Sequence, residues 1–267
     1  MSETASQSAA RPFAGRTALI TGGGSGIGLG IASALAEAGC AVALAGRRAQ
    51  PLEEAAAEMA ARGVRAITVP GDVTDSDSAR AMVERTVEEL GALQVLVNAA
   101  GMAQLGPFGE ITDQEVRALV GVDLEGPIFV TRAALPELRR HREHGGSAVL
   151  NVSSSVTLMA LKDYAVYSAA KAGLDMLTRC LALELAADRV RVNAVLPGVV
   201  ETGIFVKMLG EEGAREHLAR MPSFVPLGRL GQPADVARAA LFLCDPANDW
   251  ITGAILPVDG GLSLGPG

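Results

Sequence analysis

The 267-residue sequence is poor in aromatic side chains, in cysteine and histidine, and in positive charge. Phe, Trp and Tyr make up 3% of it and hydrophobic residues 49%, so its core has to be built from aliphatic side chains and alanine. Its net charge of −7 argues against a nucleic-acid-binding protein, because contact with phosphates needs a basic face. The one basic cluster, Arg139–Arg142 with His144, is expected at the C-terminus of a helix, where cations complement the dipole.

The few cysteines and histidines indicate the redox compartment of the protein and argue against a metal-binding protein. Cys40, Cys180 and Cys244 are odd in number, far apart and form no C-x-x-C pair, which indicates a reducing compartment. The three histidines have no ligand spacing, so we expect no metal site. Residues 1–14 are small and polar, without the apolar core of a signal peptide, and are expected to be a disordered lead. No apolar run approaches the length of a membrane span, so the sequence predicts a soluble, cytoplasmic protein with no membrane partner.

The rest of the sequence alternates between short apolar runs and stretches rich in Ala, Leu and Glu. The apolar runs are typical of buried strands and cover residues 17–20, 41–45, 66–69, 95–97, 148–152, 190–196 and 254–258. The helical stretches cover about 27–38, 50–62, 76–90, 113–143, 165–187 and 233–244. Gly39, Gly63 and Gly91 stand just past helix ends, and Asp75 and Thr112 stand at N-cap positions. This alternation predicts an α/β fold, a doubly wound, Rossmann-type parallel sheet of about seven strands with helices on both faces.

No linker or change in composition divides residues 15–267, which we expect to form one domain. Residues 202–230 fit neither a strand nor a helix pattern. A long connection at the carboxyl edge of a parallel sheet is where a substrate lid would lie, so we predict a lid there.

The stretch TGGGSGIG, residues 21–28, directly follows the first predicted strand and opens the first helix. Glycines at such a place allow phosphate oxygens to approach the backbone, and the helix N-terminus offers N–H groups. The sequence matches neither the general G-x-G-x-x-G fingerprint nor a P-loop. A flexible loop is the alternative, but the position between a strand and a helix favours dinucleotide binding.

Five motifs in order resemble the short-chain dehydrogenase/reductase family from about residue 16 to residue 261. They are Thr21-Gly22-x-x-x-Gly26-x-Gly28, Asn98-Ala99-Ala100-Gly101, Ser154, Tyr167-x-x-x-Lys171 and Pro197-Gly198. The resemblance implies an oxidoreductase that transfers hydride between a nicotinamide cofactor and a carbonyl or secondary alcohol. Because relatives are usually tetramers, it also implies a homotetramer.

Tyr167 and Lys171 stand four residues apart, so on a helix they share one face. Acting near neutral pH asks the tyrosine pKa to fall by about three units from ~10, or about 4 kcal/mol. An ammonium about 4 Å away supplies about 4 kcal/mol at an effective dielectric of about 20, and an oxidised nicotinamide would add a second positive charge. An ordinary helix face is the alternative. The resemblance implies that Tyr167 donates or removes the proton, that Lys171 lowers its pKa and binds the ribose, and that Ser154 binds the substrate oxygen.

The resemblance also implies the residues that bind the cofactor. They are Gly22, Gly24, Ser25, Gly26, Ile27, Gly28, Arg47, Arg48, Asp72, Val73, Asn98, Ala99, Ala100, Gly101, Tyr167, Lys171, Pro197, Gly198, Val200 and Thr202. Gly46 occupies the place where NAD-binding relatives carry an aspartate, and the arginines that follow suit a 2′-phosphate. Ser25 is not the basic residue that some NADP-binding relatives have. We therefore favour NADP(H), with NAD(H) as the alternative.

The chain departs from the family pattern at a fourth catalytic position, where Asp123 replaces the usual asparagine. The main-chain carbonyl that holds a water in relatives survives this change, but the side chain becomes an acceptor-only carboxylate. Asp123 either pairs with Lys171 or is inert. We expect an active enzyme with a shifted pH optimum.

Candidates for the pocket and lid are mostly apolar: Met102, Leu105, Val156, Leu158, Met159, Tyr164, Phe205, Met208, Leu209, Met221 and Phe224, with Gln104, Lys162 and His217 as polar exceptions. They favour a medium-sized, largely apolar ketone or oxoacyl substrate, reduced with NADP(H). An NAD-dependent alcohol, sugar or steroid dehydrogenase is the second hypothesis. A non-catalytic cofactor-sensing or scaffold protein is the third. Neither the substrate's identity nor the direction of the reaction follows from the sequence.

Overall fold

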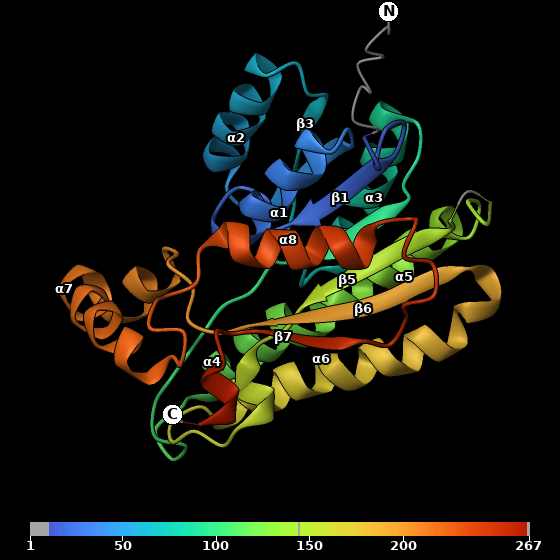
Figure 1. The fold of residues 1–267 in the computed structure, drawn as a ribbon. Coiled ribbons are helices and arrows are strands. Elements are labelled where there is room, and N and C mark those ends of the chain that lie inside the picture. Colours follow the sequence, from blue (N-terminus) through green and yellow to red (C-terminus); the bar gives the residue numbers. More distant parts are fainter. Residues whose placement is uncertain (1–10, 144, 266–267) are drawn as a thin grey trace, which may run out of the picture.

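The computed structural model describes residues 11–143 and 145–265, and its core is one seven-stranded sheet (Figure 1). All adjacent strands run parallel, in the order β3-β2-β1-β4-β5-β6-β7. The strands are β1 (Thr17–Thr21), β2 (Ala41–Gly46), β3 (Ala66–Pro70), β4 (Val95–Asn98), β5 (Ser147–Val152), β6 (Val190–Pro197) and β7 (Ile255–Val258). Each lies within one or two residues of its predicted bounds, because a strand buried on both faces is a continuous apolar run.

Helices cover both faces of the sheet, as the doubly wound prediction required. The helices are α1 (Gly26–Glu37), α2 (Ala49–Ala61), α3 (Ser76–Leu90), α4 (Asp113–Val120), α5 (Gly126–Leu138), α6 (Ala165–Glu184), α7 (Ile204–Arg220) and α8 (Pro233–Cys244). One buried cluster joins α1, α2 and α8 to one face, and a second joins α3, α5 and α6 to the other. Across both clusters, the largest fully buried side chains are almost all aliphatic, as the scarcity of aromatic residues required.

The predicted helix ends are formed by the expected residues. Asp75 accepts hydrogen bonds from the N–H groups of the first turn of α3, and Thr112 forms a capping box with Glu115 at the start of α4. Gly39, Gly63 and Gly91 all have positive φ, at 101°, 76° and 90°.

Arg139–Arg142 of the basic cluster directly follow Leu138, the last residue of α5, as expected. His144 lies outside the described residues. Its arginines form ion pairs with acidic neighbours, such as Arg139 with Asp188 at 2.7 Å and Arg140 with Glu137 at 2.8 Å. The charges of the described arginines are therefore balanced by acidic side chains near the end of the helix.

The prediction of one continuous helix over 113–143 is wrong in its interior. A π-helical turn, Gly121–Glu125, separates α4 from α5. Such a turn holds one residue more than an α-helical turn and is frequent at functional sites. Asp123 lies in its middle.

Of the described residues in the predicted disordered lead, Phe13 is buried while Arg11, Pro12 and Ala14 are exposed, so the prediction is wrong for Phe13. The side chain of Phe13 has 0% exposure and packs in the core cluster of α1, and its N–H donates to the carbonyl of Ala38. Residues 1–10 lie outside the described residues.

The expected lid region contains α7, which sequence patterns did not predict. Gly210 has φ 72° and ψ 174°, so α7 is two shorter helices joined at a kink. In Figure 1, α7 projects from the body of the molecule beside the sheet. None of the helices in the described ranges is both long enough and apolar enough to cross a membrane.

Candidate active site

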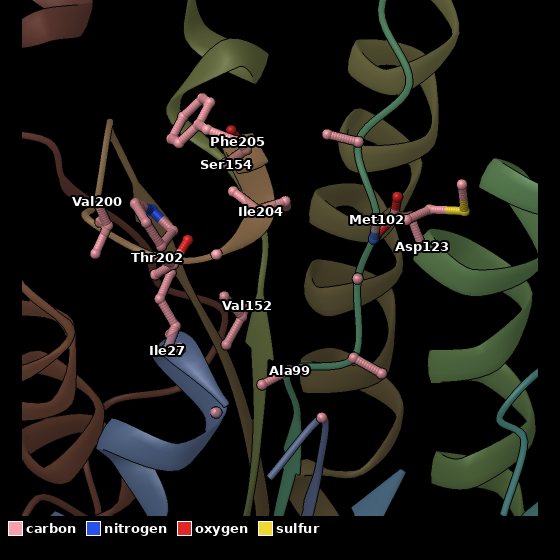
Figure 2. A pocket seen from close by; sticks show the side chains of 18 of the residues that line it. Ile27, Ala99, Met102, Asp123, Val152, Ser154, Val200, Thr202, Ile204 and Phe205 are labelled. Atoms are coloured by element: carbon pink, nitrogen blue, oxygen red, sulfur yellow. The ribbon is translucent and has the colours of Figure 1, made fainter. Parts of the chain in front are cut away.

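A cavity of about 970 Å³ opens at the carboxyl edge of the sheet. Its walls come from the segments that follow β1 to β6 and from helix α7. In an open parallel sheet this edge, where the strand order reverses beside β1, is the usual ligand site. Figure 2 shows Ile27 at one end of the cavity, Ser154 and Phe205 at the other, and Asp123 beside Met102.

The glycine loop between β1 and α1 leaves an open cradle at one end of this cavity. Gly22 has φ 68°, and a Cβ there would lie 2.8 Å from the carbonyl oxygen of Ala99. A Cβ on Gly28 would lie 2.4 Å from the carbonyl oxygen of Gly22. Ser25 occupies the N-cap of α1, and its side chain makes no capping bond, so the first N–H groups of α1 keep their hydrogen-bonding capacity. Such a helix start binds phosphate.

The cavity brings together all but one of the predicted cofactor residues. The exception is Asn98, which is 2% exposed at the end of β4. Its amide nitrogen donates to Thr131 at 3.0 Å and to Asn151 at 2.8 Å, so its side chain ties β4 to α5 and β5.

Ser154, Tyr167 and Lys171 all line the cavity. Ser154 follows β5, and the other two lie one turn apart at the start of α6. Lys171 Nζ lies 5.9 Å from the centre of the Tyr167 ring, and the phenol makes a hydrogen bond with Ser154. Tyr164, at the N-cap of α6, packs edge-on against Tyr167 with ring centres 6.4 Å apart and forms part of the wall.

Asp123 pairs with Lys171, which decides between the two alternatives that the sequence left open. Its Oδ1 lies 3.0 Å from Lys171 Nζ and accepts a hydrogen bond from the N–H of Met102 at 3.4 Å. Asp123 is 0% exposed and Lys171 4%, and Nζ also donates to the carbonyl of Val152 at 3.0 Å. The second carboxylate oxygen, Oδ2, is buried without a hydrogen-bond partner.

Comparisons with known proteins agree with these motifs. A family model described as enoyl-(acyl carrier protein) reductase matches residues 22–263. The chain is 40% identical over 251 residues to cis-4-hydroxycyclohexanecarboxylate dehydrogenase from Sinomonas cyclohexanicum, which covers 93% of this chain and 97% of the relative. It is 34% identical over 256 residues to a versicolorin reductase from Emericella nidulans, covering 92% and 95%. A solved structure described as a short-chain alcohol dehydrogenase from Sinorhizobium meliloti matches with a TM-score of 0.88 and 34% identity, over 96% of this chain and 99% of that one.

The chain belongs to the short-chain dehydrogenase/reductase family. It is therefore an oxidoreductase that uses NAD(H) or NADP(H) and acts on a small molecule. The glycine cradle and the uncapped start of α1 fit the pyrophosphate of such a cofactor.

Burial governs the ionisation of the central groups of this oxidoreductase. It raises the pKa of Tyr167; Lys171 opposes this effect, Asp123 adds to it, and the hydrogen bond with Ser154 opposes it, leaving the pKa above its usual value. Lys171 therefore does not by itself supply the drop that the sequence analysis required. The carboxylate of Asp123, 3.0 Å from Nζ, offsets the charge of Lys171.

The Asp123–Lys171 pair is also shifted by burial. Burial raises the pKa of Asp123, and Lys171 offsets only part of that shift. Burial lowers the pKa of Lys171, but the negative charges of Asp123, Tyr167 and Asp175 outweigh it, so its pKa is raised. Lys171 therefore stays charged near neutral pH.

Where β2 ends, Arg47 and Arg48 follow Gly46, and all three line the cavity. Arg47 lies 4.0 Å from Asp72, with 69% of its side chain exposed. Asp72 also accepts hydrogen bonds from the backbone and hydroxyl of Thr74.

The far end of the cavity forms the substrate lobe, and its walls are largely apolar. Nine predicted candidates line it: Met102, Leu105, Val156, Met159, Tyr164, Phe205, Met208, Met221 and Phe224. Leu158 and Leu209 do not, and of the three polar exceptions only His217 does among the described residues. Sequence reasoning missed Leu161, Ile204, Leu262 and Arg220. No signal could have found Arg220, because the helix that carries it was not predicted.

Proposed function

We propose that this protein is an NADP(H)-dependent carbonyl reductase that acts on a medium-sized, largely apolar ketone or oxoacyl substrate. The observation that carries the proposal is the convergence of Ser154, Tyr167 and Lys171 on one cavity that also contains the glycine cradle. The apolar walls of the substrate lobe support the substrate class, since apolar surfaces bind apolar groups.

In this proposal each of the three residues has one role. Ser154 donates a hydrogen bond to the substrate oxygen and stabilises the negative charge that develops there. Tyr167 gives its phenolic proton to that oxygen during reduction and removes the alcohol proton during oxidation. Lys171 holds the nicotinamide ribose and lowers the tyrosine pKa, together with the positive charge of the oxidised ring. When bound, the cofactor supplies or accepts the hydride.

Asp123 is proposed as a positioning residue for Lys171. Its carboxylate fixes Nζ at 3.0 Å and places a negative charge near the phenol. The enzyme stays active because the main-chain carbonyl of residue 123 does not depend on the side chain.

Arg47 and Arg48 support NADP(H), because a guanidinium binds a 2′-phosphate as a forked donor and Gly46 offers no competing carboxylate. A cytoplasmic location and a homotetramer complete the proposal. An NAD-dependent dehydrogenase is the second candidate: the match to cis-4-hydroxycyclohexanecarboxylate dehydrogenase supports oxidation of an alcohol.

A panel of apolar ketones with NADPH and with NADH, run with wild type and Tyr167→Phe, tests these statements. We expect oxidation of NADPH that disappears in Tyr167→Phe, while cofactor binding persists. Preference for NADH would overturn the assignment of Arg47. Cofactor binding without any turnover that depends on Tyr167 would favour a cofactor-sensing or scaffold protein.

A further inference from the structure

Among the side chains that the structure describes, one positively charged group in the substrate lobe is not used by the proposed reaction. Arg220, the last residue of α7, lines the cavity beside the apolar residues of the lid. None of the acidic side chains in the described ranges forms an ion pair with it. It differs in this from Arg215 on the same helix, which pairs with Glu212 at 3.3 Å and lies outside the cavity.

His217 lies one turn before Arg220 and also lines the cavity. Burial lowers its pKa and the charge of Arg220 lowers it further, so the imidazole is neutral near pH 7 and can offer a hydrogen bond. Its ring packs against Phe205 at a centroid distance of 4.9 Å. On a straight helix, Phe205 and His217 would be about 18 Å apart at 1.5 Å per residue. The kink at Gly210 folds α7 so that they meet, and this contact fixes the position of the imidazole.

The charges of the described cavity walls leave this end of the lobe positive. Asp72 and Asp123 are the acidic residues that line it. Asp72 lies at the adenosine end beside Arg47, and Asp123 is paired with Lys171. A ligand that carries one negative charge would therefore meet an unopposed guanidinium at the lid.

We propose that Arg220, assisted by His217, binds a carboxylate at the end of the substrate remote from the reacting carbonyl. The substrate class is then an apolar ketone, or its alcohol, that bears one carboxylate. This inference rests on the proposed function for the position of the reacting group. The planar guanidinium matches a carboxylate with two parallel hydrogen bonds. A single cation with a neutral imidazole suits a monoanion better than a phosphate.

The test uses a cyclohexanone with a carboxymethyl group opposite the carbonyl, its methyl ester and its primary amide. KM and kcat are measured with saturating cofactor for wild type, Arg220→Gln, Arg220→Lys and the matched control Arg215→Gln. Losing a charge-assisted hydrogen bond should raise KM for the acid about 10- to 100-fold in Arg220→Gln. KM for the ester and kcat should change little, Arg220→Lys should recover part of the loss, and Arg215→Gln should resemble wild type.

A second measurement separates this inference from the proposed function. The binding of cyclohexylacetate and of cyclohexylacetamide to the enzyme–cofactor complex is measured by calorimetry, which needs no turnover. Acid binding that depends on Arg220, without ketone reduction, would support the carboxylate site and overturn the proposed reaction. Ketone reduction with no preference of wild type for acid over ester and amide would overturn the carboxylate site alone. Equal losses for acid and ester in Arg220→Gln, or no binding of the acid to wild type, would also overturn it and leave Arg220 as a solvated lid residue.

Discussion

Asp123 places a buried negative charge beside the proton-transfer group, and this has a measurable consequence. Its charge raises the pKa of Tyr167, so Asp123→Asn should lower that pKa. Oxidation of an alcohol needs the phenolate, and its rate rises with pH as the phenol loses its proton. We therefore expect the rise in kcat to occur at lower pH in Asp123→Asn than in wild type. Reduction needs the protonated phenol, so its alkaline limb should also move to lower pH.

The control for this variant is Asp113→Asn, which removes an exposed carboxylate at the start of α4. Its pH–rate profile should coincide with that of wild type. Superimposable profiles for Asp123→Asn and wild type would remove Asp123 from the proton path.

Arg47 should determine the choice between the two nicotinamide cofactors. In Arg47→Ala we expect KM for NADPH to rise about 10-fold or more, because a charge-assisted hydrogen bond to phosphate is lost. KM for NADH should change little. Arg62 is an exposed arginine that pairs with Glu58 on α2, so Arg62→Ala should change neither KM value. Equal effects of Arg47→Ala on both cofactors would contradict the role assigned to it.

Residues near one another in sequence were easier to predict than residues that meet through the fold. Tyr167 and Lys171 share a helix face, which spacing alone reveals, and a glycine loop after a strand indicates its own function. Asn98 belongs to a recognisable motif, but its side chain points to Thr131 and Asn151, which are distant in sequence. The Asp123–Lys171 contact could be offered only as an alternative, because it depends on the packing of two helices.

At the scale of the elements, Asp235 holds the start of α8. It accepts hydrogen bonds from Arg229 at 2.7 Å and from the N–H of Gln232 at 2.8 Å. These bonds, the one from Arg229 first, lower the pKa of Asp235 from 3.8 to about 2. The stabilisation by its charged form is complete above the unfolded value and is lost as pH falls through the folded one.

Asp235→Asn should therefore lower Tm at neutral pH, and the difference from wild type should shrink as pH falls between those two values. Thermal unfolding at several pH values measures this. Asp77→Asn, an exposed acid on α3 paired with Arg80, should shift Tm much less at neutral pH. A Tm difference for Asp235→Asn that does not change with pH would contradict the electrostatic explanation.

Strands and capped helices were predictable because each carries a local signal. Residues 202–230 were predicted only as a long connection, and the helix α7 within them was not predicted. Gly210 interrupts α7, and the apolar residues of the whole segment follow no single helix face. Such a segment is fixed by what it packs against. The π-helical turn was hidden for a related reason, because one extra residue does not break an apolar pattern enough to be seen.

For the whole molecule, Arg191 joins the last strands of the sheet to α8. It is 5% exposed on β6, and its guanidinium donates to the carbonyls of Leu243 at 2.6 Å, Cys244 at 3.2 Å and Asp245 at 3.1 Å. Arg191→Met would remove these donors from the carbonyls of Leu243 and Cys244, while the carbonyl of Asp245 would keep the N–H of Asn248. We expect the free energy of unfolding to fall by about 2 kcal/mol or more, since each unsatisfied buried group costs about 1–3 kcal/mol.

Urea denaturation checks this value, with Arg85→Gln on the surface of α3 as the control. Arg85 pairs with Glu89 at 2.6 Å but is 48% exposed, so its loss should cost less than about 1 kcal/mol. Equal stabilities of Arg191→Met and Arg85→Gln would show that β6 and α8 are held together by apolar packing alone.

Because of the π-helical turn at Gly121–Glu125, the protein should not tolerate the loss of a residue in this stretch. A codon deleted there would leave every other amino acid named above in the protein, yet it would close the wide turn to a regular α-helical turn and change the direction of the side chains within it. The carboxylate of residue 123 would then face away from its ammonium partner. In a deletion scan along the coding sequence, deletions in this stretch should abolish activity. A conservative substitution of Val122 or Leu124 should preserve it.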